Sequence, residues 1–307
     1  MITKYLFLSV IYMVFLSIPY EIKAKPAKMV FFKSAAQKNI AIIQNKSGKK
    51  PNRLEIYNLK GKKIKSINLS FEPLTICSTD KYFVISRAKG GLSLFKINTL
   101  KEIRQKITYP ILTLYCRENK VVTGGKSISL NIYSLPKFKK IEKVGEHASW
   151  ITSIAFNQKK KYYLSTSWDH YAILWNGTRR GKVFKHGQAV KSAIFIPETS
   201  IIATIAADDR IRLWDTSNKN KKWGVLKQWK RTKNGYSLYY SSAFKSVIVT
   251  LKDGRILKYK YARGRLQRPS KKRIFKDEAV WDMLEAGGNK WIFLGSKGKV
   301  KFINPLK

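Results

Sequence analysis

Short apolar runs separated by polar turns follow one another along almost the whole chain. The runs are rich in β-branched and aromatic residues, recur about every 8 to 12 residues, and are bounded by Gly, Asn, Asp and Lys. Examples in chain order are FVISRA, LSLFKI, KVVTGG, SVIVTL, WIFLGS and KVKFIN. No stretch beyond the N-terminal segment shows the 3.6-residue period of an amphipathic helix. The pattern therefore predicts an all-β protein.

Two segments of this pattern repeat each other. One begins at His147 (HASWITSIAFNQKKKYYLSTSWDHYAILWN) and the other at His186 (HGQAVKSAIFIPETSIIATIAADDRIRLWD), an offset of 186 − 147 = 39 residues. The segments align without gaps. The same offset relates Ser165 to Thr204, Asp169 to Asp208, Phe156 to Phe195 and Trp175 to Trp214. A fixed period of this size is typical of repeat architectures.

These segments resemble the WD-repeat family. The resemblance lies in GEH at Gly145–His147, in LSTSWDHYAILWN ending just after Trp175, and in RIRLWD ending just after Trp214. Such repeats fold as four-stranded propeller blades of about 40 residues. In the family, a full blade carries a hydrogen-bonded relay of His, Ser or Thr, Asp and Trp. Matched by position, the resemblance implies two relays: His147, Ser165, Asp169 and Trp175, and His186, Thr204, Asp208 and Trp214.

Physical chemistry supports a structural role for such a relay. A buried Trp ring fills apolar space, but its N–H needs an acceptor, which a Ser or Thr hydroxyl supplies. The hydroxyl also binds the imidazole, and the carboxylate holds the other ring nitrogen, so every polar group is paired. Ser, His and Asp are also the residue types of a hydrolytic triad. Because an active site is rarely built twice at blade spacing, we expect a scaffold here and no catalytic residues.

The sequence offers little other catalytic chemistry. It contains three histidines, of which only His170 lies outside the two relays, in a turn that we expect to be exposed. It has no HExxH, GxSxG or P-loop motif and no Cys or His spacing typical of metal or haem sites. We therefore expect no enzymatic activity, no cofactor and no metal.

Weaker copies of the pattern extend the repeat over the chain. They predict blades that start near residues 29, 72, 110, 148, 188, 235 and 279, which makes about seven, with six or eight left open. The last blade lacks an outer strand, and propellers often close by exchanging terminal strands. KMVFFK, at residues 28–33, is the candidate for that strand. No linker divides residues 25–307, which we expect to form a single propeller.

Residues 1–24 have the features of a secretory signal peptide. A short positive start precedes the apolar run Tyr5–Tyr20, and a small residue, Ala24, marks the predicted cleavage site. Ile22 at the −3 position is not the usual small residue, and an uncleaved anchor is the alternative. The sequence thus predicts a periplasmic or secreted protein.

Two cysteines, Cys77 and Cys116, lie in similar apolar runs of neighbouring segments. An exported protein meets oxidising conditions, which would allow them to pair. Two buried free thiols are the alternative, and the sequence does not choose between them.

Charge and exposed aromatic residues indicate the class of partner. Lys and Arg number 62 against 18 Asp and Glu, a net charge of +44. Such a chain attracts acidic proteins or polyanions. Trp150, Trp168 and Trp281 lie outside the relays and are candidate partner-binding residues, with packing between blades as the alternative.

The leading hypothesis from the sequence is a monomeric, non-catalytic protein-interaction platform. The architecture and predicted export also resemble the propeller-type accessory proteins encoded with some periplasmic nitrate reductases. That resemblance implies a role in maturation of, or electron delivery to, a periplasmic redox enzyme. The alternative is electrostatic binding of polyanions such as acidic envelope polymers or nucleic acid.

Overall fold

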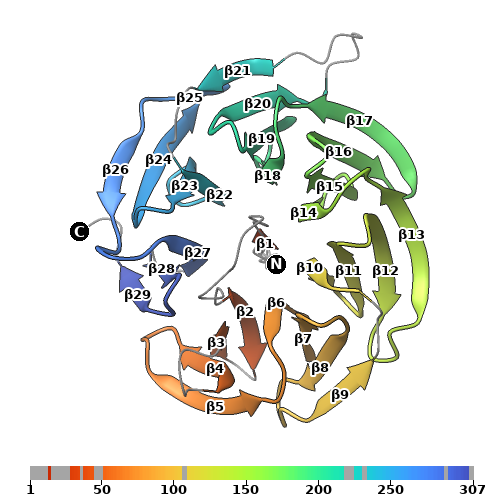
Figure 1. The fold of residues 1–307 in the computed structure, drawn as a ribbon. Coiled ribbons are helices and arrows are strands. Elements are labelled where there is room, and N and C mark those ends of the chain that lie inside the picture. The colour runs from red at the N-terminus through yellow and green to blue at the C-terminus, as the bar shows by residue number, and fades with distance from the viewer. Residues whose placement is uncertain are drawn as a thin grey trace, which may run out of the picture.

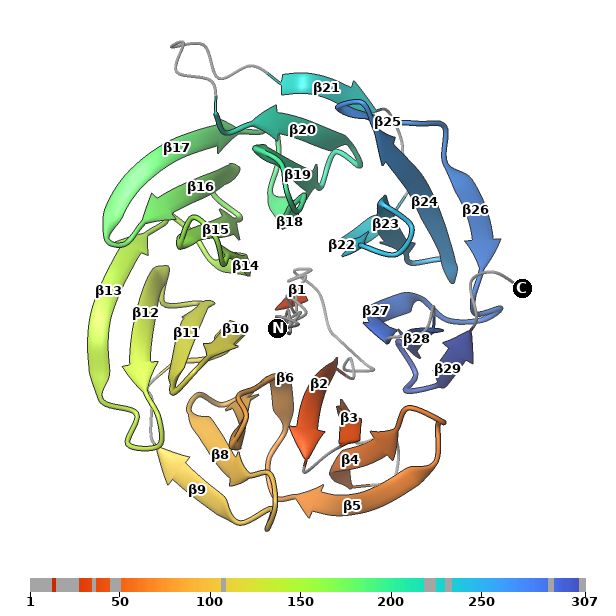
Figure 2. The same ribbon diagram turned by 180° about the vertical axis from the view of Figure 1, so that it is seen from behind.

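The fold is a closed ring of β-sheets. The computed structural model describes residues 13–14, 28–34, 37–44, 51–105, 109–217, 225–229, 234–286 and 290–303. Every regular element in these residues is a β-strand. These strands form seven antiparallel sheets that stand around a central axis as propeller blades, seen from opposite sides in Figures 1 and 2. The predicted all-β class and the count of seven blades are confirmed.

Each of the first three blades has four strands, which follow chain order from the central axis to the rim. Blade 1 contains β2 (Lys28–Ser34), β3 (Gln37–Gln44), β4 (Asn52–Asn58) and β5 (Lys63–Leu69); blade 2 contains β6 (Pro73–Ser78), β7 (Tyr82–Arg87), β8 (Leu92–Lys96) and β9 (Glu102–Gln105); blade 3 contains β10 (Ile111–Arg117), β11 (Lys120–Gly125), β12 (Ser129–Ser134) and β13 (Lys140–Glu146).

The remaining blades keep this order, with additions at blades 4 and 6 and a shorter blade 7. Blade 4 contains β14 (Ile151–Asn157), β15 (Tyr162–Ser167), β16 (Tyr171–Asn176) and β17 (Arg179–Lys185); blade 5 contains β18 (Val190–Phe195), β19 (Ile201–Ala206), β20 (Ile211–Asp215) and β21 (Val225–Trp229); blade 6 contains β22 (Gly235–Ser241), β23 (Ser246–Leu251), β24 (Arg255–Ala262), β25 (Arg265–Leu266) and β26 (Ser270–Arg273); blade 7 contains β27 (Val280–Ala286), β28 (Lys290–Gly295) and β29 (Val300–Ile303).

The inner strands begin within about three residues of the predicted blade starts, at residues 28, 73, 111, 151, 190, 235 and 280. The agreement has a simple cause. Inner strands are buried on both faces and therefore appear as nearly continuous apolar runs, such as β18, in which every residue is buried.

Ring closure differs from the prediction. Lys28–Ser34 does not complete blade 7; it forms β2, the inner strand of blade 1, and pairs over its whole length with β3. Blade 7 has three strands among the described residues, and β2 lies beside its inner strand β27. The reason is local: the hairpin from β2 to β3 forms seven consecutive residue pairs across a short connection, which a distant exchange would forfeit.

The hydrophobic core lies between the blades because each strand directs alternate residues to its two neighbours. In β24, Leu257 and Tyr259 belong to the cluster shared with blade 5, whereas Ile256 belongs to the cluster shared with blade 7. No sheet is stable alone in this arrangement, so each blade depends on packing against the next.

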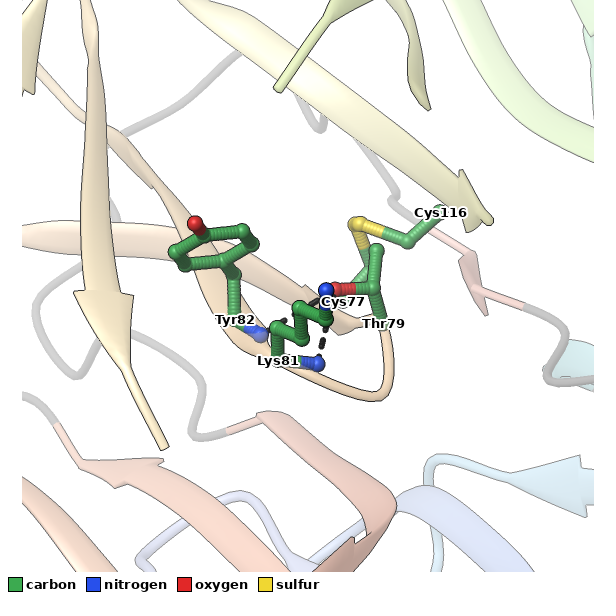
Figure 3. Close-up of a disulfide and its surroundings, with 5 residues drawn as sticks. All are labelled: Cys77, Thr79, Lys81, Tyr82 and Cys116. Atoms are coloured by element: carbon green, nitrogen blue, oxygen red, sulfur yellow. Dashed lines mark hydrogen bonds between the residues drawn. A yellow bond between two sulfur atoms is a disulfide. The ribbon is translucent and has the colours of Figure 1, made fainter. Parts of the chain in front are cut away.

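A disulfide joins Cys77 of β6 to Cys116 of β10, a choice that the sequence left open. The two residues stand 39 positions apart, one blade spacing, so equivalent positions of adjacent inner strands face each other. Figure 3 shows the bond beside the turn after β6, where Thr79 Oγ1 accepts hydrogen bonds from the backbone N–H groups of Lys81 and Tyr82. The disulfide therefore links blades 2 and 3 covalently.

The predicted signal peptide lies mostly outside the described residues, including its cleavage site after Ala24. Within it, the structure describes only β1 (Met13–Val14), which pairs antiparallel with β14. Within the part of the chain that the structure describes, no helix has the length and apolar character needed to cross a bilayer.

Candidate functional site

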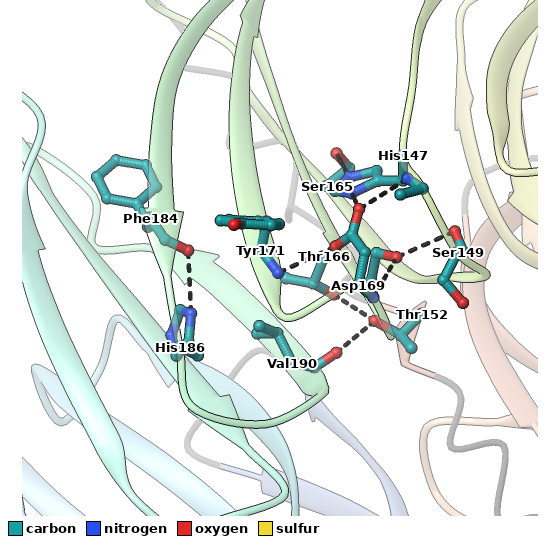
Figure 4. A network of polar contacts seen from close by, with 12 residues as sticks. His147, Ser149, Thr152, Ser165, Thr166, Asp169, Tyr171, Phe184, His186 and Val190 are labelled. Atoms are coloured by element: carbon teal, nitrogen blue, oxygen red, sulfur yellow. Dashed lines mark hydrogen bonds and ion pairs between the residues drawn. The ribbon is translucent and has the colours of Figure 1, made fainter.

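The structure brings the four residues of the first predicted relay together in blade 4. The indole N–H of Trp175 donates to Ser165 Oγ (2.8 Å), and Ser165 Oγ lies 2.7 Å from His147 Nε2. His147 Nδ1 lies 2.8 Å from Asp169 Oδ2 (Figure 4). Because a carboxylate only accepts, Nδ1 carries the proton toward Asp169 and the serine hydroxyl donates to Nε2. Every polar atom of the chain from indole to carboxylate is thus paired.

Asp169 also holds two loops. Its Oδ2 accepts from the backbone N–H of Ala148, and its Oδ1 accepts from that of Tyr171. Burial opposes ionisation of Asp169, but the hydrogen bonds from His147 and from these backbone N–H groups outweigh it and hold the pKa of Asp169 below its ordinary value. His170 next to it is exposed, as expected, with a φ of 74° that suits a tight turn.

The relay does not present a usable nucleophile. Ser165 is fully buried, and its hydroxyl is engaged by both Trp175 and His147. Trp175 is packed so closely that a Cβ on Gly145 would lie 2.1 Å from its ring. The geometry therefore fastens β13, β15 and β16 to one another and leaves no space for a substrate beside the hydroxyl.

The second relay keeps only three of its four predicted members. Trp214 donates to Thr204 Oγ1 (2.9 Å), which lies 2.8 Å from His186 Nε2. His186 Nδ1 donates to the backbone carbonyl of Phe184 (3.0 Å), and Asp208 is not its partner. Instead, the two guanidinium N–H groups of Arg212 donate to the two carboxylate oxygens of Asp208. The prediction for Asp208 therefore differs from the structure.

Arg212 explains the difference. It occupies the position that Ile173 has in blade 4, since 173 + 39 = 212. A bidentate pair with a guanidinium is stronger than a hydrogen bond from a neutral imidazole, so Asp208 turns to Arg212. Burial opposes ionisation of Asp208, yet the bonds from Arg212 keep its pKa below the ordinary value. The replacement of the isoleucine at position 173 by an arginine at the equivalent position 212 was the sequence signal for this change of partner of Asp208.

The pH dependence of the free energy of unfolding should reveal that His186 is buried beside Arg212 and not bound to a carboxylate. Burial, followed by the charge of Arg212, lowers the pKa of His186 to about 4. Between about pH 6.5 and 4 the unfolded chain binds a proton at this residue and the folded chain does not, so stability falls as the pH falls. We expect a loss of about 2–3 kcal/mol from pH 7 to pH 4.5, measured by urea unfolding.

The variant His186→Asn should lose most of this pH dependence. His170→Asn is the matched control, because His170 is exposed and should leave the slope unchanged. An unchanged slope in His186→Asn would contradict a neutral, buried imidazole.

Two of the three candidate partner-binding residues form one surface cluster. Trp150, in the β13–β14 loop, stacks on Trp168, in the β15–β16 turn, with ring centroids 5.1 Å apart. The backbone N–H of Trp168 donates to the carbonyl of Trp150, and Lys126 Nζ lies 4.5 Å from the centre of the Trp150 ring. Both indoles are half-buried. We call Lys126, Trp150 and Trp168 the tryptophan cluster.

Trp281 lies elsewhere, within the inner strand of blade 7. Its ring contacts the ring of Tyr236 in blade 6 in a tilted arrangement, with centroids 4.2 Å apart and an interplanar angle of 41°. Each of the two residues is the second residue of its inner strand, at a β-bulge: Tyr236 in β22 and Trp281 in β27. Thr152 and Lys191 lie at the equivalent bulges of blades 4 and 5. The side chain of Thr152 donates to the carbonyl of Val190, and that of Lys191 donates to the carbonyl of Gly235, each in the next blade. Trp281 thus serves contact between blades, the alternative that the sequence left open.

Within the described ranges, no group of three or more His, Cys, Asp or Glu residues has the geometry to hold a metal ion. The carboxylates of the two repeats bind local partners: Asp169 binds His147, and Asp208 binds Arg212.

Comparison with known proteins agrees with this geometry. The family model for the WD domain, G-beta repeat, matches residues 138–176, which include β13 to β16 and the first relay. Proteins named eukaryotic translation initiation factor 3 subunit I, from Botryotinia fuckeliana (strain B05.10) and Sclerotinia sclerotiorum (strain ATCC 18683 / 1980 / Ss-1), are each 35% identical over 86 residues. That match covers 27% of this chain and 24% of theirs, so this chain matches about a quarter of the length of these relatives.

Solved structures show the same fold over nearly the whole chain. A chain of the mitotic checkpoint complex has a TM-score of 0.75 at 13% identity and covers 98% of both chains. The WD40 β-propeller domain of Doa1 has a TM-score of 0.72 at 10% identity, with 95% and 96% coverage. The chain is therefore a seven-bladed β-propeller in which one segment, from β13 of blade 3 to β16 of blade 4, is similar in sequence to a WD repeat.

Proposed function

We propose that this protein is an exported, non-catalytic platform that binds a protein partner through the tryptophan cluster. The observation that carries the proposal is the stacked pair Trp150–Trp168 with Lys126 over it. Large aromatic side chains on rigid elements are frequent anchors of protein interfaces, and a cation beside them favours an acidic partner. WD-repeat propellers typically bind protein partners, and one structural neighbour is part of a complex.

Two features support export. The N-terminal segment has the pattern of a secretory signal peptide. The disulfide between Cys77 and Cys116 would persist in an oxidising compartment and not in a reducing cytosol. Together they favour a periplasmic or secreted location.

Within that location, an accessory role for a periplasmic redox enzyme is the finer proposal. It rests on the resemblance in architecture and compartment to the accessory proteins of periplasmic nitrate reductases. The chain has no CxxCH motif of its own, so its part would be docking or maturation and not electron storage.

Capture of the partner from the envelope fraction of the source organism tests the proposal. The wild-type protein should retain a defined protein at low and at high salt, because an aromatic anchor is less sensitive to ionic strength than phosphate or carboxylate contacts. Trp150→Ala/Trp168→Ala should weaken binding of that protein by about 10- to 100-fold, as expected for loss of interface anchors. Tyr109→Ala, which removes another exposed aromatic residue (39% exposed), should leave it unchanged.

Polyanion binding is the second candidate, because the rim of the propeller is basic. Outer strands β5, β13, β17 and β26 carry exposed Lys and Arg. Charged side chains on rim strands also hinder edge-to-edge association of propellers, and this effect alone can explain them without a polyanion. If capture is lost at high salt and the tryptophan variants bind as well as wild type, the polyanion function replaces the platform.

A further inference from the structure

Among the described residues, the rim of the propeller lacks an outer strand at blade 7. Blades 1 to 6 each have an outer strand, whereas β29 pairs only with β28 among the described residues. Figure 1 shows the interruption between β26 of blade 6 and β5 of blade 1. The outer edge of β29 therefore presents backbone N–H and C=O groups that no described strand uses.

A groove opens on the face of blade 6 that looks toward this interruption. Ile256 of β24 packs against blade 7, and because side chains alternate along a strand, Lys258 and Lys260 share its face. A cavity of about 410 Å³ is lined there by Ala243, Phe244, Lys245, Ser246, Lys258 and Lys260. Lys258 Nζ lies 5.1 Å from the centre of the Phe244 ring, so the groove combines cations with an apolar wall.

The strand edge and the groove are neighbours. Ile303 of β29 packs against the same apolar cluster as Phe244. Lys301 of β29 reaches toward blade 6, where its Nζ donates to the carbonyl of Ile274 and lies over the Phe275 ring. A strand added to β29 would therefore run beside the groove.

Among the described residues, Lys245, Lys258 and Lys260 form no ion pair. Two acidic side chains of blade 7 have other partners: Glu285 accepts hydrogen bonds from Ser241 and Ser242, and the carboxylate of Glu278 is 1% exposed and lies 4.0 Å from Lys299 Nζ. A ligand that brings carboxylates would supply the missing negative charge.

We propose that an extended, acidic segment of a partner protein completes blade 7 as its fourth strand. The segment pairs with the outer edge of β29 and places alternate acidic side chains against Lys258 and Lys260, while apolar side chains contact Phe244. The proposal rests on the platform function and names the chemistry of a second contact, apart from the tryptophan cluster.

A defined probe tests this contact. The probe is a fluorescent twelve-residue peptide of alternating Glu and Val, with a proline-interrupted version that cannot pair and a single-stranded oligothymidine of the same length. The full-length mature chain should bind the alternating peptide at about 150 mM salt and gain hydrogen-exchange protection at Val300–Ile303. Lys258→Glu/Lys260→Glu should weaken binding by about tenfold or more. Lys139→Glu/Lys140→Glu, an equal charge reversal at exposed positions of blade 3, should not.

Three results would overturn the inference: no binding of the alternating peptide, binding without protection of β29, or equal binding of the interrupted peptide or the oligothymidine. Equal weakening of peptide binding by the two double charge reversals would also overturn the inference, because it would indicate electrostatic attraction to the whole protein and not to the groove. If the envelope partner still depends on Trp150 and Trp168 but not on Lys258 and Lys260, this inference fails and the platform function stands.

Discussion

Replacing Trp175 with alanine is expected to lower the free energy of unfolding by about 3–5 kcal/mol, the range for a buried aromatic residue. Trp175 is 2% exposed and lies in the cluster between blades 3 and 4. Its loss leaves a cavity and also removes the donor that binds Ser165. Urea unfolding of the protein, followed by circular dichroism, measures the change.

Two further variants separate packing from hydrogen bonding. Ser165→Ala keeps the ring but leaves the indole N–H and His147 Nε2 without a partner, so we expect a loss of about 1–3 kcal/mol. Trp150→Ala removes a half-buried indole and should cost about 1 kcal/mol or less. If Trp175→Ala changes stability no more than Trp150→Ala does, the relay is not the brace that the geometry indicates.

Removing the disulfide is expected to destabilise the protein by about 4 kcal/mol. In the chain-entropy description, a cross-link between residues 39 apart lowers the entropy of the unfolded chain by this amount. For a chain of this size, about 2 °C of melting temperature corresponds to each kcal/mol, so Cys77→Ala/Cys116→Ala should melt about 8 °C lower. Differential scanning calorimetry measures the shift.

Reduction of the wild-type protein provides the control, because it breaks the cross-link and keeps both side chains. The reductant should lower the wild-type melting temperature by a similar amount and should leave the alanine variant unchanged. Free thiols found by mass spectrometry in the protein isolated from its source would contradict both the cross-link and its use as support for the proposed export.

The two proposed contacts differ in what they need from the fold. The tryptophan cluster needs rigid loops, and Asp169 supplies this by holding Ala148 and Tyr171 at the bases of the loops that carry Trp150 and Trp168. The edge of β29 needs only an unpaired strand beside a basic groove. A partner that used both would have to span the propeller from blade 4 to blade 7, and linked contacts of this kind strengthen each other.

Much of the scaffold could be predicted from the sequence by itself. Strand alternation and the offset of 39 residues depend on local spacing, and they led to the all-β class and the number of blades. The resemblance to WD repeats implied the first relay. His147, Ser165, Asp169 and Trp175 meet because a repeated sequence folds into repeated strands.

Only the tertiary structure decided which partner each group takes when two compete. Asp208 binds Arg212 and not His186, and Lys28–Ser34 pairs with β3 of blade 1 and not with blade 7. The pairing of Cys77 with Cys116 and the contact of Trp281 with Tyr236 likewise depend on how close neighbouring inner strands lie. Sequence periodicity reports the conformation of one segment, whereas such choices depend on the difference in free energy between alternative contacts in three dimensions.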